Sequence, residues 1–380
     1  MEIVADRALI DPEMRDYLGL TEAELGLVAM DPGYPGVSPT ARLDSFLSDD
    51  RYQFVELNAE SPAGIAYADV ASELFCGLEV MRRFRAQYQI SALSGREKLL
   101  NVLLSAYSEF APGAPRPQIG IVDFRGLPTE REFELFKEFF ERHGYPTLIA
   151  DPRELEYSDG KLRCREFEIN LVYKRVLVNE YLEKMDEAPA LYEAYRDRAV
   201  CVVNSFRGKL VHKKLLFGVL TDERFERYFA AEEREFLRQH IPWSRRLEHR
   251  RTNYRGTHID LVDWARTNRQ QLVLKPNDEY GGKGISLGWM SSPEEWDQAI
   301  AVGLGGHFIL QERVSTPHEV FPCIADGRRI EFAEQLVDLD PLLFDGRVGS
   351  AFTRLSSSGL CNVTAGGGMV PTFIVEGRIA

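Results

Sequence analysis

The feature that most constrains this chain is a short apolar run, Leu272 to Leu274, that ends in Lys275 and is followed by a proline and a glycine-rich loop. Three consecutive apolar residues are typical of a short buried strand. Pro276 ends this strand because proline has no backbone N–H to contribute to a strand ladder. The pattern therefore predicts that the Lys275 ammonium is held at a strand end, next to the loop.

The loop after this strand can bring backbone N–H groups close to an anion. Its glycines have no Cβ that would block such an approach, and a second lysine adds positive charge. The residues concerned are Gly281, Gly282, Lys283 and Gly284. This arrangement indicates a nucleotide-phosphate site. A surface hairpin whose glycines serve only its turn is the alternative, and the loop by itself does not decide between the two.

Composition places the chain among ordinary globular proteins and narrows its partners. With 380 residues, of which 44% are hydrophobic and 28% charged, the chain is long enough for two or three cores. The formal net charge of -13 argues against a nucleic-acid backbone as the main partner, because such binding needs a basic face. An acidic surface would tolerate a cationic amine substrate.

Cysteine usage and targeting patterns lead us to expect a cytoplasmic protein without a membrane partner. Five cysteines are scattered and form no C-x-x-C pair, so neither a disulfide framework nor a zinc site is indicated. The first residues lack a basic segment followed by an apolar core, and no run of about 18 apolar residues occurs.

Helical and strand patterns predict an α/β (α+β) chain in three parts, residues 1–114, 115–200 and 201–380. The proline-rich segment 111–117 marks the first boundary, and the middle part begins with a βαβ unit. The expected strands are 52–58, 118–124, 147–151, 169–175, 272–274, 308–314 and a pair within 328–338. The expected helices are 12–17, 21–30, 65–75, 97–110, 128–143, 213–220, 293–301 and a charged, mostly solvated stretch at 222–251.

Four common enzyme motifs are absent: the P-loop, the dinucleotide-binding glycine fingerprint, the H-E-x-x-H zinc motif and the G-x-S-x-G elbow. What remains is Lys275, the glycine loop and the later strand Phe308 to Val314. In that order these features resemble the ATP-grasp fold, in which a lysine precedes a glycine-rich lid and a hinge strand holds the adenine. The resemblance implies that Gln311, Glu312 and Val314 bind the base and that exposed strand backbone pairs with its edge.

An ATP-grasp site also needs oxygen ligands for magnesium. The Glu-x-Asn pair expected after the hinge is missing there and occurs near the N-terminus instead, as Glu56-Leu-Asn58. Residues 56 and 58 of a strand point to the same face. This displaced order resembles the circularly permuted ATP-grasp enzymes, and particularly the synthetase domain of glutathionylspermidine synthase. In that family Arg-x-Asp precedes Glu-x-Asn-Ala-Asp/Glu-x-Pro, and here Arg42-Leu-Asp44 precedes the run from Glu56 to Pro62.

The resemblance implies a role for each of these residues. Asp44, Glu56 and Asn58 would bind two magnesium ions, and Arg42 would stabilise charge on the transferred phosphoryl group. It also implies a circularly permuted ATP-grasp fold with an inserted α/β domain of the substrate-binding kind. The segment from residue 350 to 371 departs from the ending expected of glutathionylspermidine enzymes, so glutathione and spermidine are not assigned as substrates.

Two further cations are candidates at this site. The family has a lysine before Leu-Leu, and Lys213 aligns with it, although the sequence does not decide whether Lys213 or Lys214 faces ATP. Arg354, with the glycines 366–368, could bind a phosphate or a substrate carboxylate, since arginine forms paired hydrogen bonds with such groups. A plain β-turn explains the glycines nearly as well.

The function expected from these motifs is that of an ATP-dependent carboxylate–amine ligase. The γ-phosphoryl group would pass to a small-molecule or peptide carboxylate, and an amine would displace phosphate from the acyl phosphate to form an amide or peptide bond. A small-molecule kinase would share every nucleotide feature and differ in its acceptor. A regulator that binds MgATP without turnover is the third possibility, and the presence of all three expected metal ligands counts against it. Neither the substrates nor the oligomeric state follow from the sequence.

Overall fold

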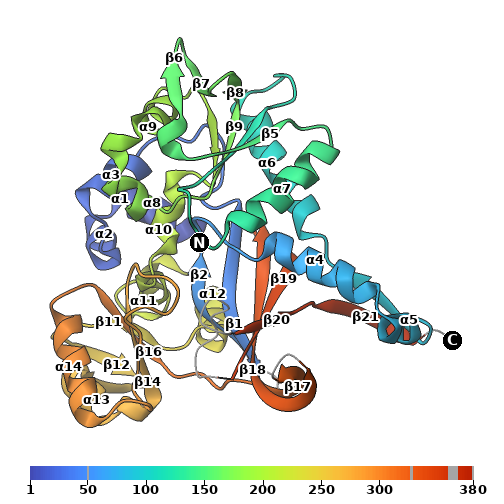
Figure 1. Cartoon of the computed structure of the whole chain (residues 1–380). Coiled ribbons are helices and arrows are strands. Elements are labelled where there is room, and N and C mark those ends of the chain that lie inside the picture. Colours follow the sequence, from blue (N-terminus) through green and yellow to red (C-terminus); the bar gives the residue numbers. More distant parts are fainter. Residues whose placement is uncertain (49–50, 326–327, 358–366, 379–380) are drawn as a thin grey trace.

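The computed structural model describes residues 1–48, 51–325, 328–357 and 367–378, and its centre is an antiparallel sheet built from both ends of the chain. The order is β2 (Arg51–Asn58), β1 (Thr40–Ser48), β18 (Arg329–Phe344), β19 (Arg347–Ser356) and β20 (Gly368–Val370), with β17 (His318–Ala325) paired to β18. β1 pairs with β18, so a strand near the N-terminus joins strands near the C-terminus (Figure 1).

A parallel sheet stands above the central sheet in the same view. Its order is β10 (Cys201–Val203), β9 (Leu171–Lys174), β4 (Ile119–Val122) and β5 (Thr147–Ala150). β4, α7 (Glu130–Arg142) and β5 form a parallel βαβ unit, as the sequence predicts. The phenylalanines of α7 pack into one core beside α6 (Gly95–Phe110), because their spacing places them on one helix face. The other sheet face carries α8 (Val178–Glu183) and α9 (Pro189–Arg196), and a small antiparallel sheet, β6 to β8 (Glu156–Ser158, Lys161–Cys164, Phe167–Ile169), adjoins it.

A third sheet contains the Lys275 strand. Its order is β11 (Ser244–Arg246), β16 (Phe308–Glu312), β14 (Leu272–Pro276) and β15 (Ser286–Leu287), and α13 (Leu261–Thr267) and α14 (Pro293–Leu304) complete its core. β16 therefore has a partner on each side, β11 and β14. The expectation that the strand at 308–312 offers exposed backbone to adenine is wrong for Ile309 to Gln311, because both edges of that segment are already paired.

The charged stretch 222–251 is helical only in part. A short 3₁₀ turn (Glu226–Tyr228) and α12 (Ala231–His240) are followed by β11 and by β12 (Arg251–Tyr254), which pairs with β13 (Thr257–Asp260). Pro242 cannot continue a helix, and pairing with β16 draws the next residues into a strand. The stretch is also less solvated than expected: Asp222 is 1% exposed and accepts a hydrogen bond of 2.6 Å from Arg250.

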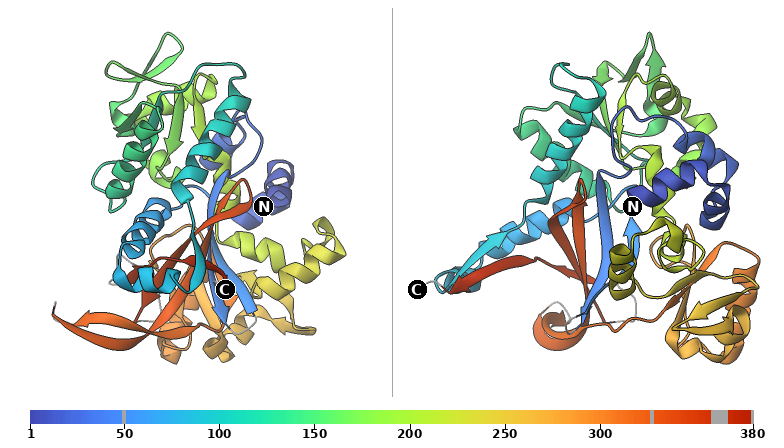
Figure 2. Two further views of the ribbon diagram at one scale, coloured as in Figure 1. Left: turned by 90° about the vertical axis from the view of Figure 1, so that its right-hand side faces the viewer. Right: turned by 180° about the vertical axis from the view of Figure 1, so that it is seen from behind.

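Helices cover the central sheet on both sides. α1 (Glu2–Ile10), α2 (Pro12–Leu18) and α3 (Glu22–Val28) pack with α10 (Lys209–His212) and α11 (Leu215–Thr221) in a core that includes Leu57. α4 (Ile65–Cys76) packs on β19 and leads into an arm formed by α5 (Glu79–Arg85) and the strand pair β3 (Tyr88–Ala92) and β21 (Phe373–Arg378). The arm and the β17–β18 hairpin project from the body of the molecule (Figure 2). Within the described residues, no helix is long and apolar enough to cross a membrane.

The buried amide of Asn204 joins the parallel sheet to the central sheet. Asn204 directly follows β10 and is fully buried. Its Nδ2 donates hydrogen bonds to the carbonyl oxygens of Thr40 (2.7 Å) and Ala59 (2.9 Å), and its Oδ1 accepts from the Thr40 backbone N–H (3.0 Å). One side chain therefore satisfies backbone groups from the start of β1 and from the segment after β2, and so positions both strands.

We expect Asn204→Ala to lower the free energy of unfolding by about 3 kcal/mol, because it removes the hydrogen bonds that this side chain makes to buried backbone groups of Thr40, Ala59 and Glu60. Urea denaturation followed by circular dichroism measures this. The control is Asn101→Ala, which removes an exposed amide from α6 and should change little. Equal stability of Asn204→Ala and wild type would mean that the hydrogen bonds of this amide do not stabilise the contact between the two sheets.

Candidate functional site

The motif residues of three distant segments meet on one face of the central sheet. Cross-strand register places Arg42 opposite Asn58 and Asp44 opposite Glu56. On the next two strands of the sheet, Asp338 of β18 lies opposite Arg354 of β19. Along a single strand, residues 42 and 44, 56 and 58, and 338 and 340 occupy alternate positions, so the two side chains of each pair project to the same side. A site composed of residues 42–58, 338–340 and 354 is therefore a product of sheet pairing.

Three buried carboxylates form the centre of this site. Ligand oxygens of Asp44, Asp338 and Asp340 lie within 4.8 Å of one another. Arg42 donates to Asp44 Oδ1 (2.8 Å), and Arg354 donates to Asp44 Oδ2 (2.7 Å) and to Asp338. Burial acts to raise the pKa of Asp44, but the two arginines outweigh it and hold that pKa below its usual value. We call Asp44, Asp338, Asp340, Arg42 and Arg354 the aspartate–arginine cluster.

The other two carboxyl groups of this cluster are not fully compensated. Burial, followed by repulsion from Asp44 and Asp338, raises the pKa of Asp340 well above its usual value, and burial also raises the pKa of Asp338. Asp340 Oδ2 lies 3.0 Å from Arg354 and 3.7 Å from Arg42, and a side-chain hydrogen bond between Asp338 and Asp340 lowers the pKa of Asp338 and raises that of Asp340. A bound cation would stabilise the charged forms of both carboxyl groups.

Lys275 reaches this sheet from the third sheet. Its ammonium donates to the backbone oxygen of Val55 in β2 (3.2 Å) and to Gln311 Oε1 in β16 (2.8 Å). Burial lowers the pKa of Lys275 to about 8, and the nearby Glu56 opposes this shift. The lysine therefore lies beside the segment that carries the Glu-x-Asn pair, although the two are separated by more than two hundred residues in sequence.

The structure distinguishes the two neighbouring lysines. Lys213 donates to the Gly19 backbone oxygen (2.9 Å) and pairs with Glu24 (3.0 Å), so it faces the N-terminal helices. Lys214 pairs with Glu56 Oε1 (3.2 Å) and contributes to the electrostatic environment of Lys275. Of the pair left open by the sequence, Lys214 is the one that lies with Glu56 and Lys275.

The glycine-rich loop lies over the end of β14. Gly281, Gly282 and Gly284 have φ values of 67°, 79° and 69°, which side-chain-bearing residues rarely adopt. The ammonium of Lys283 lies 4.8 Å from the ring centroid of Tyr280. The hydroxyl of Tyr280 donates to Glu180 Oε1 of α8 (3.0 Å), so the loop contacts the α/β unit that contains the parallel sheet.

The remaining hinge residues occupy different positions. Gln311 is buried and binds Lys275. The Glu312 carboxylate accepts from Tyr254 (2.6 Å) and Arg255 (2.7 Å). Val314 follows the end of β16 and is half-buried. Among the predicted C-terminal glycines, Gly366 lies outside the described residues, and Gly368 pairs with Leu355 at the start of β20.

The motif comparison assigns no role to Asp338 and Asp340, and it leaves Lys214 undecided beside Lys213. The two aspartates alternate in Leu-Val-Asp-Leu-Asp, a pattern that places both on one strand face. That alternation predicts that the two aspartates share a strand face. Only the pairing of β18 with β1 shows that Asp44 lies on the same face. Nothing in the sequence shows that Lys214, and not Lys213, faces the site.

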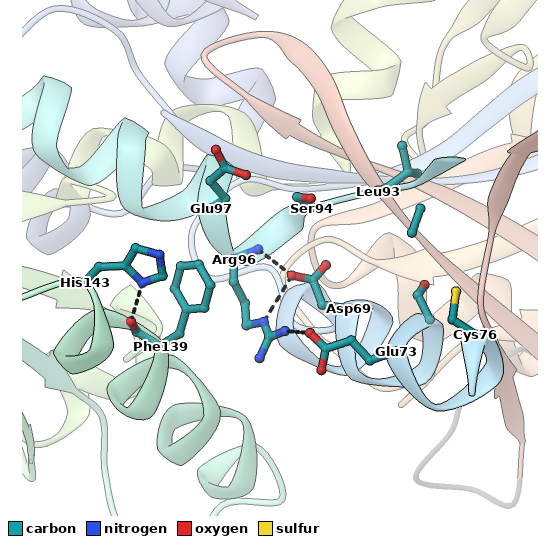
Figure 3. Close-up of a pocket in the computed structure, with 11 residues that line it drawn as sticks. Asp69, Glu73, Cys76, Leu93, Ser94, Arg96, Glu97, Phe139 and His143 are labelled. Atoms are coloured by element: carbon teal, nitrogen blue, oxygen red, sulfur yellow. Dashed lines mark hydrogen bonds and ion pairs between the residues drawn. The ribbon is translucent and has the colours of Figure 1, made fainter. Parts of the chain in front are cut away.

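A cavity of about 350 Å³ lies elsewhere, between α4, α6 and α7 (Figure 3). Arg96 donates from its side chain to Asp69 and Glu73, while Asp69 also accepts from the Gly95 and Arg96 backbone N–H groups at the start of α6. These contacts pair the charges internally and cap the helix. The cavity shares no residue with the aspartate–arginine cluster.

Comparison with known proteins supports the fold. No family model matches the chain. A glutathione synthetase-like effector from Globodera pallida superimposes with a TM-score of 0.54 at 14% identity, covering 98% of this chain and 84% of that protein. A structure from Methylobacillus flagellatus, provisionally named a γ-glutamylcysteine synthetase, gives a TM-score of 0.48 at 11% identity. The effector shows that this mixed α/β arrangement occurs in a glutathione synthetase-like protein, consistent with an ATP-grasp-like fold. The circular permutation stays a prediction.

One curated sequence is similar over most of the chain. It is a Frankia casuarinae protein provisionally named glutamate–cysteine ligase 2-2, which is 23% identical over 355 residues. The match covers 86% of this chain but only 37% of that protein. The chain therefore corresponds to somewhat more than a third of its relative, and the activity of the whole relative does not transfer directly.

We expect the buried charge of Lys275 to make stability depend on pH. The unfolded chain holds this proton up to the ordinary pKa of 10.5, whereas the folded protein releases it above about 8. Between these values the unfolded state binds more protons, so the free energy of unfolding rises with pH. Relative to Lys275→Met, wild type should gain about 2 kcal/mol from pH 7 to pH 10. The control is Lys283→Met, which removes an exposed lysine of the same loop. A pH-independent difference would contradict this prediction.

Proposed function

We propose that this chain is an ATP-dependent carboxylate–amine ligase that forms an amide or peptide bond and releases ADP and phosphate. The observation that carries this proposal is the convergence of Lys275, Lys214 and Glu56 with the aspartate–arginine cluster. Cations for phosphate and carboxylates for a metal ion lie side by side, beneath a glycine-rich loop. The similarity to a provisionally named glutamate–cysteine ligase supports the ligase reaction over the alternatives.

The metal proposed here is magnesium, and the donor set fits it. Mg²⁺ prefers carboxylate oxygens and bridges nucleotide phosphates, which it polarises for transfer. Asp44, Glu56 and Asn58 are the proposed ligands. Asn58 Nδ2 donates to Asp44 Oδ1 (2.9 Å), which orients the amide so that its oxygen is the remaining donor atom. The carboxylates of Asp338 and Asp340 add a second set of possible ligands in the same cluster.

The proposed reaction has two steps. A substrate carboxylate oxygen attacks the γ-phosphorus, the bond to the β-phosphate oxygen breaks, and ADP leaves. An amine then attacks the acyl carbon, phosphate leaves with the bonding electrons, and the amine loses a proton. Lys275 and Lys214 bind phosphate oxygens, while Arg42 and Arg354 offset the charge that develops on the transferred group. The glycine loop excludes water, which would otherwise hydrolyse the acyl phosphate.

The test is a screen of acids and amines for release of ADP and phosphate, beginning with L-glutamate and L-cysteine because of the relative's name. We expect turnover that requires acid, amine and Mg²⁺ together, and a loss of at least about 100-fold in Glu56→Ala. Glu183→Gln, which neutralises an exposed glutamate of α8, is the control. Release of AMP and pyrophosphate would refute the acyl-phosphate route. A phosphorylated product that forms without an amine would indicate a kinase, and nucleotide binding without turnover would indicate a regulator.

Metal dependence can be measured without turnover. Calorimetric titration with a non-hydrolysable ATP analogue should give at least about tenfold tighter binding with Mg²⁺ than with EDTA. We expect Asp44→Ala to lose this gain, because it removes a proposed ligand, while Asp186→Ala, at an exposed aspartate, keeps it. Circular dichroism and thermal unfolding of each variant check its folding. Equal affinity with and without Mg²⁺ in wild type would contradict the metal assignment.

A further inference from the structure

The strand order of the parallel sheet creates a topological switch point that the proposed nucleotide site does not use. From β4 the chain passes through α7 to β5 on one side, whereas from β9 it passes through α8 and α9 to β10 on the other side. The connections therefore diverge between β4 and β9. In open parallel sheets, ligands bind outside the carboxyl ends of the strands at such a switch point.

A buried carboxylate without an ion pair lies at this point. Asp123 directly follows β4 and is 7% exposed. Its Oδ1 accepts from the Phe124 backbone N–H (2.9 Å), but among the described residues its Oδ2 has no hydrogen bond and the side chain forms no ion pair. Burial raises the pKa of Asp123 to about 7. Because burial disfavours the charged form of a carboxyl group, a cationic ligand would stabilise the Asp123 carboxylate.

The two cations near Asp123 make their hydrogen bonds to other groups, and the Nε atom of Arg175 has no hydrogen-bond partner among the described residues. The Nη1 atom of Arg175 donates to the Pro62 backbone oxygen (2.7 Å) and to the Tyr173 hydroxyl (2.9 Å). The Lys174 ammonium donates to the Val176 backbone oxygen (2.9 Å). Both cations lower the pKa of Asp123 from a distance, yet neither comes within ion-pair range of it. The charge at the switch point therefore stays available to a ligand.

The switch point lies next to both parts of the proposed nucleotide site. Glu180 of α8 is an electrostatic neighbour of Asp123, and it accepts the hydrogen bond from Tyr280 of the glycine-rich loop. The hydroxyl of Ser61, three residues beyond Asn58, donates to the Arg175 backbone oxygen (2.6 Å). In Figure 1 this end of the parallel sheet faces the central sheet. A group bound at Asp123 would thus lie between the glycine-rich loop and the segment around Ser61, which follows the proposed metal ligands.

We propose that Asp123, assisted by Glu180, binds the primary ammonium group of a substrate of this enzyme, an inference that rests on the proposed ligase function. An ammonium group carries one positive charge and three N–H donors. It would therefore supply Asp123 with the ion pair and the hydrogen bond that its free oxygen lacks. Asp123 and Glu180 select for charge, while transfer of the phosphoryl group takes place at the aspartate–arginine cluster.

Two substrates of a ligase could bring this ammonium group: an amino acid that supplies the carboxylate, or the amine that accepts the acyl group. Hydroxylamine in place of the amine separates the two cases, because it converts the acyl phosphate to a hydroxamate and bypasses the amine. L-Glutamate and glutarate serve as a donor pair that differs only in the ammonium group. L-Cysteine serves as the acceptor.

We expect Asp123→Asn and Glu180→Gln to raise KM for the ammonium-bearing substrate by about 10- to 100-fold, with KM for ATP and kcat at saturation little changed. If the donor binds there, hydroxamate formation from L-glutamate is impaired and that from glutarate is not. If the acceptor binds there, hydroxamate formation is unchanged and KM for L-cysteine rises. Asp186→Asn and Glu183→Gln, which neutralise exposed residues of the same region, are the matched controls.

Other results would overturn the assignment. One such result is that the variants leave KM unchanged both for the donor in the hydroxamate assay and for L-cysteine. Another is that KM rises equally for L-glutamate, glutarate and ATP. If no acid supports turnover, the ligase proposal itself fails, and calorimetric titration of wild type with the twenty amino acids then tests the site directly. Binding that Asp123→Asn weakens at least tenfold would support an ammonium site. Absence of binding, or binding that the substitution leaves unchanged, would refute it.

Discussion

The pairing of β1 with β18 is the interaction on which the rest of the structure depends. It joins Thr40 to Phe344 and Arg42 to Leu342, residues about three hundred positions apart. Closing such a loop costs entropy, which the ladder and the helices packed on both faces of the sheet must offset. Without this pairing the carboxylate of Asp44 would lie far from those of Asp338 and Asp340. The candidate site is thus a property of the sheet and not of any one segment.

Incomplete charge compensation distinguishes this site from an ordinary structural ion-pair network. Arg42 and Arg354 face three buried aspartates, and burial together with repulsion from Asp44 and Asp338 raises the pKa of Asp340. On the other side of Glu56 positive charge is in excess, because Lys214 and Lys275 lie close together. Burial lowers the pKa of Lys275. A nucleotide with its magnesium would relieve both imbalances, since it brings anionic phosphate to the lysines and a cation to the carboxylates.

Local sequence patterns predicted many of the helices and strands. They failed where tertiary packing determines which strands become neighbours and which way a side chain points. The βαβ unit from β4 to β5 was predictable because strand and helix periodicities are local. The position of β16 inside its sheet was not, because a strand's own sequence does not reveal whether it has one neighbour or two. Lys213 and Lys214 are adjacent residues with the same charge, and only the packing of α10 and α11 turns one toward Glu24 and the other toward Glu56.

By itself, the sequence determined which chemistry is available: a lysine at a strand end, a loop whose glycines accept positive φ values, and Arg-x-Asp and Glu-x-Asn pairs whose members share a strand face. These follow from residue type and from the two-residue period of a strand, which need no knowledge of distant contacts. Tertiary structure alone decided that Asp338 and Asp340 join Asp44, that Lys214 lies with Lys275, and that Asp123 lies at a switch point without an ion pair to any described residue. Each of these depends on which strands become neighbours, and that choice is made by the burial of whole sheet faces.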